Sequence, residues 1–326
     1  MLGGVESAES KGRALNFEVW PEAIELGHMF ADEGYELALV GGPVRDLLLH
    51  RKSHDLDFCS SARPEQFEHI LRAWGHDGFW DMGRKFGTLG AMRRRPDGTP
   101  VQVEVTTYRS DTYDPDSRKP EVNYGDSLEG DLSRRDFTVN AMALRVPDLE
   151  FVDPFGGAND LAKGVLRTPV NPRQSFDDDP LRMMRAIRFV AQLGFSIEPE
   201  TAQAITEMTE RIRIVSAERV RDELVKMLLS TRPRAGVEAL VESGLADIVL
   251  PEIPALKLEI DEHHRHKDVF EHTMIVLDRA VALETGPDGP VPAPDLELRL
   301  AALLHDIGKP ATRKFEDHGK VSFHHH

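Results

Sequence analysis

Two hydrophobic patterns follow one another along the chain, and they predict two differently built halves. Between residues 17 and about 155, apolar residues at helical spacing alternate with short β-rich runs at 37–40, 55–58 and 101–105. This alternation predicts a domain with both helices and strands. Beyond Asp179 the strand patterns nearly vanish, and apolar residues recur at helical spacing. The second half is therefore predicted to be all-helical.

Residues 41 to 57 carry the first candidate chemistry. Gly41 and Gly42 lie between a predicted strand and a predicted helix, where backbone N–H groups can approach phosphate oxygens without a Cβ in the way. Asp55 and Asp57 lie in a predicted strand, so both carboxylates share one face while Leu56 points into the core. Adjacent carboxylates repel each other unless a divalent cation lies between them, and Mg²⁺ prefers such oxygen ligands together with substrate phosphates. A lone Asp-x-Asp is more often a solvated strand end, but the glycines just upstream favour a metal site.

Three further features could complete such a site. Glu104 lies in the predicted strand 101–105, either as a third carboxylate or as an ordinary polar-face residue, and the pattern leaves both open. Segment 109–120 is a long polar loop, and such loops are often mobile or functional. Arg134 and Arg135 precede an apolar run that predicts a helix. Guanidinium groups match phosphate oxygens bidentately, so this pair could clamp a triphosphate, although surface ion pairing would also explain it.

A predicted helix near residue 180 carries a basic stripe. Pro180 suits the first helical position and Asp179 the N-cap, and capping alone could explain both residues. The helix then places polar side chains within an arc of about 120°, opposite an apolar face. These side chains are Arg182, Arg185, Arg188 and Gln192. A basic stripe on a buried helix requires an anionic partner.

Composition narrows the function classes. The 326 residues include 40 basic and 56 acidic side chains, a net charge of −16, so a polyanion must be held by local basic patches against the overall field. Indiscriminate nucleic-acid binding is thereby disfavoured. The single cysteine, Cys59, excludes an internal disulfide and a Cys-x-x-Cys metal site. Because no apolar run approaches about 20 residues and the N-terminus lacks a signal-peptide layout, we expect a cytoplasmic protein without a membrane partner.

Taken together, the motifs closely resemble the bacterial class II tRNA nucleotidyltransferase and poly(A) polymerase family. They follow in the family's order as Gly41-Gly42-x-Val44-Arg45-Asp46, Asp55-x-Asp57, Arg134-Arg135-Asp136-Phe137-Thr138-x-Asn140-Ala141, Asp153-Pro154-Phe155-Gly156-Gly157, Asp179-Pro180-Leu181-Arg182 and Glu218-Arg219-Val220-x-x-Glu223-Leu224. The resemblance covers about residues 30–230. It implies an α+β fold, with a polymerase β-like head at 17–165, an all-helical neck and body at 166–258, and an incomplete HD domain at 259–326.

The resemblance also implies roles for individual residues. Asp55 and Asp57 would hold Mg²⁺. From its strand position, and not from the resemblance, Glu104 is predicted as a further catalytic carboxylate. The nucleotide would be bound by Gly41, Gly42, Arg45, Arg134, Arg135, Asp136, Asn140, Asp179, Arg182, Arg185 and Arg188. Among these, Asp179 and Arg182 would read the incoming base through hydrogen bonds similar to Watson–Crick pairing.

The implied activity is template-independent addition of CMP and AMP from CTP and ATP to tRNA 3′ ends, with release of pyrophosphate. A bacterial poly(A) polymerase is the alternative, and segment 83–88 combines features of both branches. A more remote alternative is an HD-type metal phosphohydrolase whose head only binds nucleotide. The chain departs from the family at Asp178, where the family commonly has Glu.

A second resemblance lies near the C-terminus. His272 and the pair His305-Asp306 resemble the HD domain, in which these residues ligate a divalent metal for phosphoester hydrolysis. Gly308 and Pro310 are expected to terminate the second of the two helices involved. The chain ends at residue 326, where the family often continues with more helices, so a later metal-ligating Asp would be missing.

Overall fold

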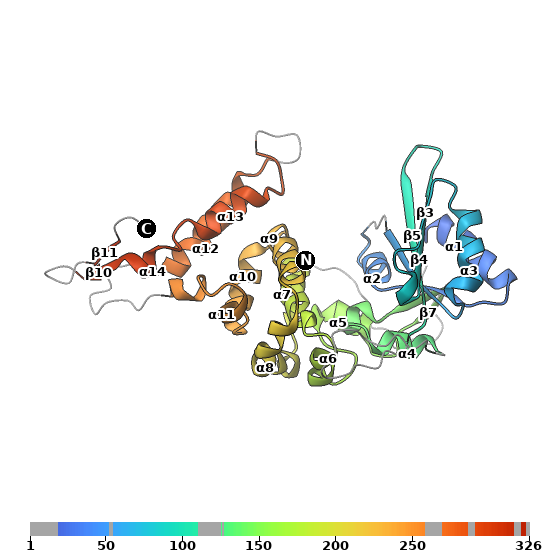
Figure 1. Cartoon of the computed structure of the whole chain (residues 1–326), viewed down its shortest axis with the longest axis horizontal. Helices are drawn as coiled ribbons and strands as arrows, with labels where there is room; N and C mark the ends of the chain where they lie inside the picture. The colour runs from blue at the N-terminus through green and yellow to red at the C-terminus, as the bar shows by residue number, and fades with distance from the viewer. Residues whose placement is uncertain are drawn as a thin grey trace. The chain divides into compact units, whose positions relative to one another are not determined.

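The structure, a computed structural model, describes residues 19–51, 55–109, 125, 127–257, 269–285, 291–315 and 321–323. Of the predicted loop 109–120, all but Arg109 lies outside these described residues. The chain divides into two compact units between Asp178 and Asp179. In Figure 1 the first unit runs from blue to yellow-green and the second from yellow to red. Within the described segments, no helix has the length and apolar character needed to cross a membrane.

A seven-stranded mixed sheet forms the centre of the first unit, in the order β3-β4-β5-β2-β1-β6-β7. Its strands β2 and β5 pair in parallel, and all other neighbouring strands pair antiparallel. The strands are β1 (Leu37–Val40), β2 (Asp55–Ser60), β3 (Gly78–Trp80), β4 (Thr88–Arg94), β5 (Pro100–Thr107), β6 (Ala143–Val146) and β7 (Glu150–Val152). The unbroken apolar run of β1 is buried along its full length, as expected for a central strand covered on both faces.

Alternating burial along the strands separates two faces of the sheet. On one face, Cys59 packs in a cluster with Leu128 and Leu132 of α4 (Leu128–Ser133). Leu56 and Phe58 of β2 have the opposite parity and point to the face that carries α1 (Pro21–Asp32) and α3 (Pro64–Trp74) (Figure 1). The carboxylates of β2 therefore lie on the same face as Cys59 and α4.

The remaining elements of the first unit connect the strands. They are α2 (Gly42–Leu48), the 3₁₀ turns η1 (Arg84–Phe86) and η2 (Thr138–Asn140), α5 (Gly157–Lys163), β8 (Val165–Leu166) and α6 (Pro172–Asp178). The predicted helix after Arg135 is wrong, because the apolar run there forms η2 and then the central strand β6. A short strand in which only Arg145 is not buried shows no clear alternation, so its sequence cannot be told from a buried helix by periodicity.

The second unit is built mainly of helices. They are α7 (Leu181–Leu193), α8 (Pro199–Met208), η3 (Thr209–Ile214), α9 (Ala217–Leu228), α10 (Pro233–Glu242), α11 (Ala246–Val249), η4 (Pro254–Leu256), α12 (Val269–Leu283), α13 (Leu296–Leu304) and α14 (Lys309–Thr312). The prediction of an all-helical second half is wrong at three short strands, β9 (Ser196–Ile197), β10 (Arg313–Phe315) and β11 (Val321–Phe323). Runs of two or three residues are too short for a period-2 pattern to register.

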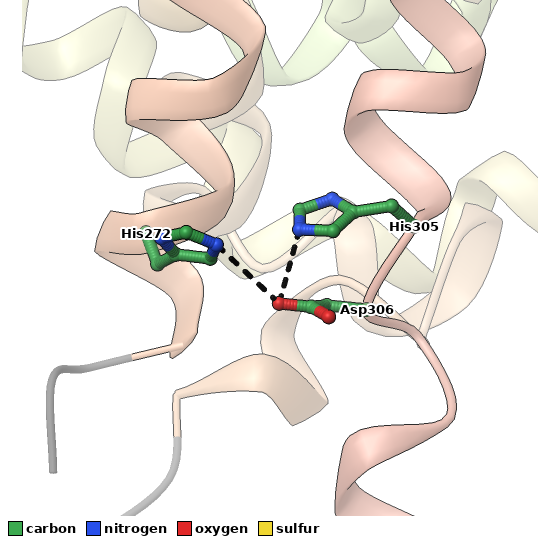
Figure 2. Close-up of side chains that lie close together, drawn as sticks. All are labelled: His272, His305 and Asp306. Carbon is green, nitrogen blue, oxygen red and sulfur yellow. Dashed lines mark ion pairs between the residues drawn. The ribbon is translucent and has the colours of Figure 1, made fainter. Parts of the chain in front are cut away.

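Helix packing in the second unit brings chain-distant residues together. α7 packs against α9 and α10, and α12 packs against α13. The second of these contacts places His272 of α12 beside His305 and Asp306, which directly follow α13 (Figure 2). The prediction that Gly308 and Pro310 end this helix is wrong, because α13 ends at Leu304 and Pro310 lies inside the short helix α14. Proline is tolerated there because it occupies the first turn of α14.

Candidate active site

The glycine pair lies where the sequence predicts it, between β1 and α2. Gly41 has a φ of +74°, a conformation that side chains other than glycine rarely adopt. A Cβ on Gly41 would lie 3.0 Å from the NH1 atom of Arg135. Glycine here therefore serves two purposes, a tight turn and the close approach of a guanidinium group.

Three carboxylates share one face at adjacent strands. Asp55 and Asp57 of β2 are exposed, whereas Leu56 between them is buried. Glu104 of β5 lies directly beside Asp57, because β2 and β5 pair in parallel with these two residues in register. Of the two interpretations of Glu104 that the sequence left open, the structure thus places it next to the aspartates.

Trp80 contacts this group, and the sequence analysis missed it. Its Nε1 donates a hydrogen bond to Oε1 of Glu104 at 3.3 Å. The indole lies against Gly90, where a Cβ would come within 2.1 Å of the ring. A glycine inside a strand marks close approach by another group, and this was the available signal.

The pKa of Asp57 reflects this clustering of negative charge. Partial desolvation raises the pKa, although the carboxylate still reaches solvent, and the charges of Glu104 and Asp55 raise it further against the opposing effect of Arg135. The raised pKa of Asp57 beside two further carboxylates fits a divalent cation, which would relieve the repulsion between them. Among the described residues, Glu104 does not converge with the two aspartates into a three-ligand group. Asp55 and Asp57 are therefore the residues that could hold the metal.

An open pocket of about 200 Å³ adjoins these carboxylates. Asp57 and Glu104 form its acidic side, and Arg109, Arg134 and Arg135 form its basic side. Val40, Phe58 and Thr106 complete the lining. A pocket with both charges suits a polyphosphate that reaches a metal at one end and guanidinium groups at the other.

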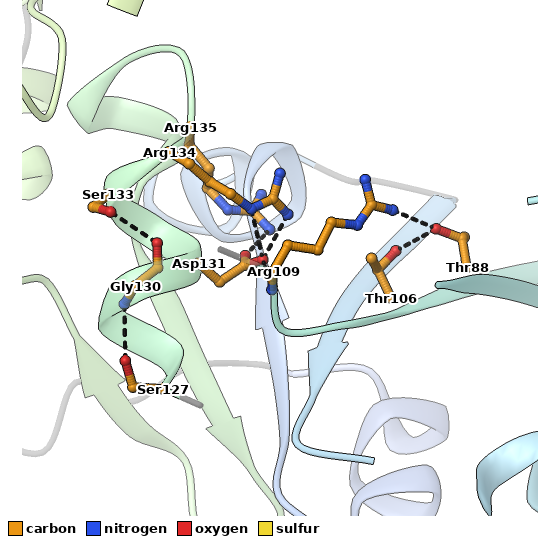
Figure 3. Close-up of polar contacts among 9 residues, drawn as sticks. All are labelled: Thr88, Thr106, Arg109, Ser127, Gly130, Asp131, Ser133, Arg134 and Arg135. Atoms are coloured by element: carbon orange, nitrogen blue, oxygen red, sulfur yellow. Dashed lines mark hydrogen bonds and ion pairs between the residues drawn. The ribbon is translucent and has the colours of Figure 1, made fainter. Parts of the chain in front are cut away.

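A buried acid holds the arginine pair, as Figure 3 shows. Asp131 of α4 is completely buried, and its Oδ1 accepts from Arg134 NH2 at 2.6 Å and from Arg134 Nε at 3.1 Å. Its Oδ2 accepts from Arg135 NH2 at 2.9 Å. The pairing is therefore to an internal carboxylate, which the interpretation of surface ion pairing did not include. The i, i+3 and i, i+4 spacing from Asp131 was a signal that could have found it.

Arg109 links the pocket to the start of the predicted loop. Its NH2 donates to Thr88 Oγ1 at 2.9 Å, and that hydroxyl is 2.9 Å from Thr106 Oγ1 (Figure 3). Its backbone N–H donates to Asp131 Oδ1 at 3.4 Å. Arg109 is thus held at its backbone by Asp131 of α4 and at its side chain by Thr88 of β4.

Arg45, Asn140 and Asp136 form a chain of hydrogen bonds beside the pocket. Arg45 NH1 donates to Asn140 Oδ1 at 2.8 Å, and Asn140 Nδ2 donates to Asp136 Oδ1 at 3.0 Å. The same Asp136 oxygen accepts from the backbone of Phe137 at 2.8 Å. Asp136 and Asn140 are buried, so the motif fixes the turn that follows the arginine pair.

The base-reading residues implied by the family lie in the second unit. α7 begins at Leu181 with Pro180 as its N-cap, so the predicted start is one residue early. Asp179 nevertheless accepts from the backbone N–H of Leu181 at 3.2 Å, and its other oxygen accepts from Arg219 NH2 at 3.2 Å. Arg182 is buried, with 6% of its surface exposed.

The basic stripe on α7 has the anionic partner that its burial requires. Arg188 Nε donates to Glu223 Oε2 of α9 at 2.5 Å, and Arg188 NH1 donates to Gln192 Oε1 at 2.6 Å. Arg185 lies on the same face and is half-buried. Glu223 belongs to the motif Glu218-Arg219-Val220-x-x-Glu223-Leu224, but no local spacing pairs it with Arg188.

The three predicted HD residues converge in the second unit (Figure 2). One ligand atom from each of His272, His305 and Asp306 lies within 4.8 Å of the others. Nε2 of His305 is 3.1 Å and Nε2 of His272 is 3.8 Å from Asp306 Oδ2. Nδ1 of His305 is 2.8 Å from the Ala302 carbonyl, an arrangement that directs Nε2 toward a metal. Asp306 also accepts from Lys309 Nζ at 2.7 Å.

Comparison with known proteins places the chain in a family. Residues 37–167 match the "Poly A polymerase head domain", residues 194–256 the "Probable RNA and SrmB- binding site of polymerase A", and residues 269–326 the "HD domain". The CCA-adding enzyme of Lactobacillus johnsonii is 38% identical over 233 residues, which cover 71% of this chain and 56% of that protein. The CCA-adding enzyme of Enterococcus faecalis is 40% identical over 212 residues, which cover 65% of this chain and 50% of that protein.

Solved structures of CCA-adding enzymes have folds similar to that of this chain. A crystal structure of the Bacillus stearothermophilus CCA-adding enzyme in complex with CTP has a TM-score of 0.61 at 36% identity, covering 70% of this chain and 53% of that one. The structure of the Thermotoga maritima CCA-adding enzyme complexed with tRNA_CCA has a TM-score of 0.65 at 25% identity, and the match covers 88% of this chain and 63% of that one. The chain belongs to the poly(A) polymerase and CCA-adding nucleotidyltransferase family, whose members are divalent-metal-dependent. It spans about half the length of the curated relatives it matches.

Proposed function

We propose that this protein is a tRNA nucleotidyltransferase that adds CMP and AMP from CTP and ATP to the tRNA 3′ end and releases pyrophosphate. The observation that carries the proposal is the pocket that Asp57 and Glu104 line together with Arg134 and Arg135. The names of the relatives support it, since those named are CCA-adding enzymes and one was solved with CTP.

In this reaction the terminal 3′-hydroxyl attacks the α-phosphate in line, and pyrophosphate leaves without a covalent enzyme intermediate. Mg²⁺ held by Asp55 and Asp57 would activate the hydroxyl and neutralise charge on the leaving group. Arg134 and Arg135, which line the same pocket as Asp57, would bind the triphosphate, and their N–H groups can hold its oxygens in a fixed orientation.

The remaining predicted residues take supporting roles. We propose that Asp136, held by Asn140 and through it by Arg45, positions the ribose. Asp179 and Arg182 would read the base edge, with Arg185 and Arg188 of the same helix extending the nucleotide-binding surface. A carboxylate beside a guanidinium offers acceptors and donors in a fixed plane, which base discrimination requires.

We propose the domain limits 17–165 for the head, 166–258 for the neck and body, and 259–326 for the start of an HD domain. The three family matches, at 37–167, 194–256 and 269–326, support this order, while the division into compact units lies thirteen residues after the proposed end of the head, between Asp178 and Asp179. We further propose that His272, His305 and Asp306 hold a second divalent metal. The buried, free Cys59 fits the reducing cytoplasm as the compartment.

The test uses the full chain, Mg²⁺ and a tRNA that ends at the discriminator base. The protein is incubated with CTP, with ATP and with both, and the products are sequenced. We expect two C residues with CTP alone and the complete CCA end with both nucleotides. Long A tracts on arbitrary RNA would instead identify a poly(A) polymerase, and a tRNA that is never extended would overturn the proposal. The Asp57→Asn variant serves as the inactive control.

A further inference from the structure

Asp131 joins three parts of the pocket wall through one carboxylate. It lies on α4 with no exposed surface, and it accepts hydrogen bonds from Arg134, from Arg135 and from the backbone N–H of Arg109 (Figure 3). These three arginines form the basic side of the pocket. Asp131 does not line the pocket, so it acts on a ligand only through them.

The position of Arg135 is defined from two sides. Asp131 Oδ2 accepts from NH2, while NH1 lies over Gly41 where a Cβ would be only 3.0 Å away. Arg134 and Arg135 side chains keep 22% of their surface exposed, so each guanidinium is anchored at one edge and still reaches the pocket.

The charge on Asp131 is secure in the folded protein. Burial alone would raise its pKa, but Arg135 and Arg134 outweigh burial and hold the pKa below its ordinary value. Burial would lower the pKa of Arg135, but Asp131 reverses this and the net pKa is raised. Asp131 and Arg135 therefore remain ionised, and the negative charge of Asp131 offsets the two guanidinium groups, which would otherwise repel each other at short range.

We propose that Asp131 is a positioning residue for the triphosphate, and that it both orients the Arg134 and Arg135 guanidinium groups and moderates their affinity for phosphate. This inference rests on the proposed function and deepens it. An internal counter-ion competes with the ligand for the same guanidinium groups. Asp131 therefore weakens the binding of the triphosphate but holds the two guanidinium groups in a fixed orientation. Such an arrangement also favours release of pyrophosphate after transfer.

The Asp131→Asn variant separates this role from a purely structural one. Asparagine keeps the size of the side chain but removes its charge, and its amide can no longer accept from both arginines. We expect kcat for CMP transfer to fall by about 10- to 100-fold, because the clamp loses its orientation. Inorganic pyrophosphate, titrated with Mg²⁺ in a calorimeter, should bind about 2- to 10-fold more tightly, because the arginines lose their internal counter-ion.

A matched control comes from Asp160, another buried acid of the same unit. It accepts from Thr138 Oγ1 at 2.8 Å and pairs with Arg167 at 3.4 Å, away from the pocket lining. Asp160→Asn should lower thermal stability but leave pyrophosphate affinity unchanged. Weaker pyrophosphate binding or unchanged kcat in folded Asp131→Asn would overturn the inference.

A second variant keeps the test decisive if the asparagine variant does not fold. Asp131→Glu retains the charge but moves it by one methylene, so kcat should fall while pyrophosphate affinity stays within about 2-fold of the unchanged protein. An unchanged kcat in this variant would contradict the positioning role. If the unchanged protein binds pyrophosphate but adds no CCA, the proposed function fails and the variants' pyrophosphate affinities still decide the role of Asp131. If it binds no pyrophosphate, both proposals fail.

Discussion

The ionised carboxylate of Asp57 is less favourable in the folded protein than in the unfolded chain, and its effect on the thermal stability of the protein can be measured. The pKa of Asp57 is raised in the folded state, so the folded protein releases this proton less readily than the unfolded chain does. The resulting loss of folding free energy is fully present above the raised pKa. As the pH falls through the raised pKa, the carboxyl becomes neutral and the penalty disappears. At pH 7 in EDTA, Asp57→Asn should therefore raise Tm by about 1–2 °C, a value kept small because solvent screens the group.

The same substitution should abolish nucleotide transfer. Removing one of two carboxylates that hold Mg²⁺ is expected to lower kcat by about 10³-fold or more, and Asp55→Ala should do the same with the fold intact. Transfer assays with Mg²⁺, together with thermal melts at pH 7 and at pH 4, measure both effects. The Tm difference between Asp57→Asn and the unchanged protein should shrink at the lower pH. Near-normal transfer by either variant would reduce that residue to a solvated acid at a strand end.

Arg182 offers a test of base selection. If it forms the protein template with Asp179, Arg182→Ala should relax the preference for CTP and ATP over UTP and GTP by about 10-fold or more. Triphosphate affinity should change less, because Arg134 and Arg135 bind that part of the nucleotide. Arg213→Ala is the matched control, since that arginine is exposed and pairs with Glu210 on the same turn. Unchanged selectivity would leave Arg182 as a packed stripe residue.

Local spacing predicts some of these residues and not others. Asp55 and Asp57 were found because strand geometry alone puts an i, i+2 pair on one face. Glu104 required the strand pairing of β2 with β5, which no local pattern contains, and so its role stayed open. Trp80 and the pairing of Glu223 with Arg188 were missed because these partners lie 24 and 35 residues apart in the chain.

At the scale of elements too, features that depend on local spacing were predicted correctly, and features that depend on distant pairing were not. The helix predicted near residue 180 was found as α7, which has a clear apolar face and ends at Gly194 in a left-handed conformation, as helix-ending rules expect. The apolar run after Arg135 was predicted as a helix, but it forms the 3₁₀ turn η2 and leads into β6, where only Arg145 is not buried. The order of strands in the sheet depends on pairings between distant segments and could not be derived from periodicity.

The segment after β5 gives a prediction at this scale. Arg109 is anchored by Thr88 and by Asp131, so the chain leaves the pocket wall from a fixed point. The predicted loop that follows is polar and contains Asp114-Pro115 and Lys119-Pro120. Such a segment can absorb the backbone change needed to accept first C and then A. Deleting residues 111–118 should leave CC addition measurable and stop addition of the final A.

Sequencing of the products checks this deletion. A control deletion should fall at an unrelated polar turn, such as residues 96–98 between β4 and β5. That turn is closed by a hydrogen bond from Gly98 to Arg95 at 2.8 Å and does not line the pocket. If the 111–118 deletion still completes the CCA end, the loop has no role in switching nucleotides.

For the whole molecule, the two units carry separate candidate chemistry. The paired carboxylates and the arginine clamp belong to the first unit, and the cluster of His272, His305 and Asp306 belongs to the second. The family order of head, RNA-binding and HD regions was predictable because each has its own motif. The boundary between Asp178 and Asp179 lies directly before the Asp179-Pro180-Leu181-Arg182 motif, where the hydrophobic pattern changes from mixed to helical, whereas the resemblance implied a head that ends at residue 165.

This separation predicts that the second metal site can be removed without stopping nucleotide transfer. His305→Ala removes a ligand whose Nε2 lies 3.1 Å from Asp306 Oδ2, so it should lower the affinity for Mn²⁺ at the second unit by about 10-fold or more. CMP transfer should stay within about 2-fold of the unchanged protein, because Asp55 and Asp57 remain intact. Calorimetric Mn²⁺ titration of the Asp57→Asn protein, with and without His305→Ala, isolates the second site. Unchanged Mn²⁺ binding would mean that Lys309, 2.7 Å from Asp306, neutralises this carboxylate in place of a metal.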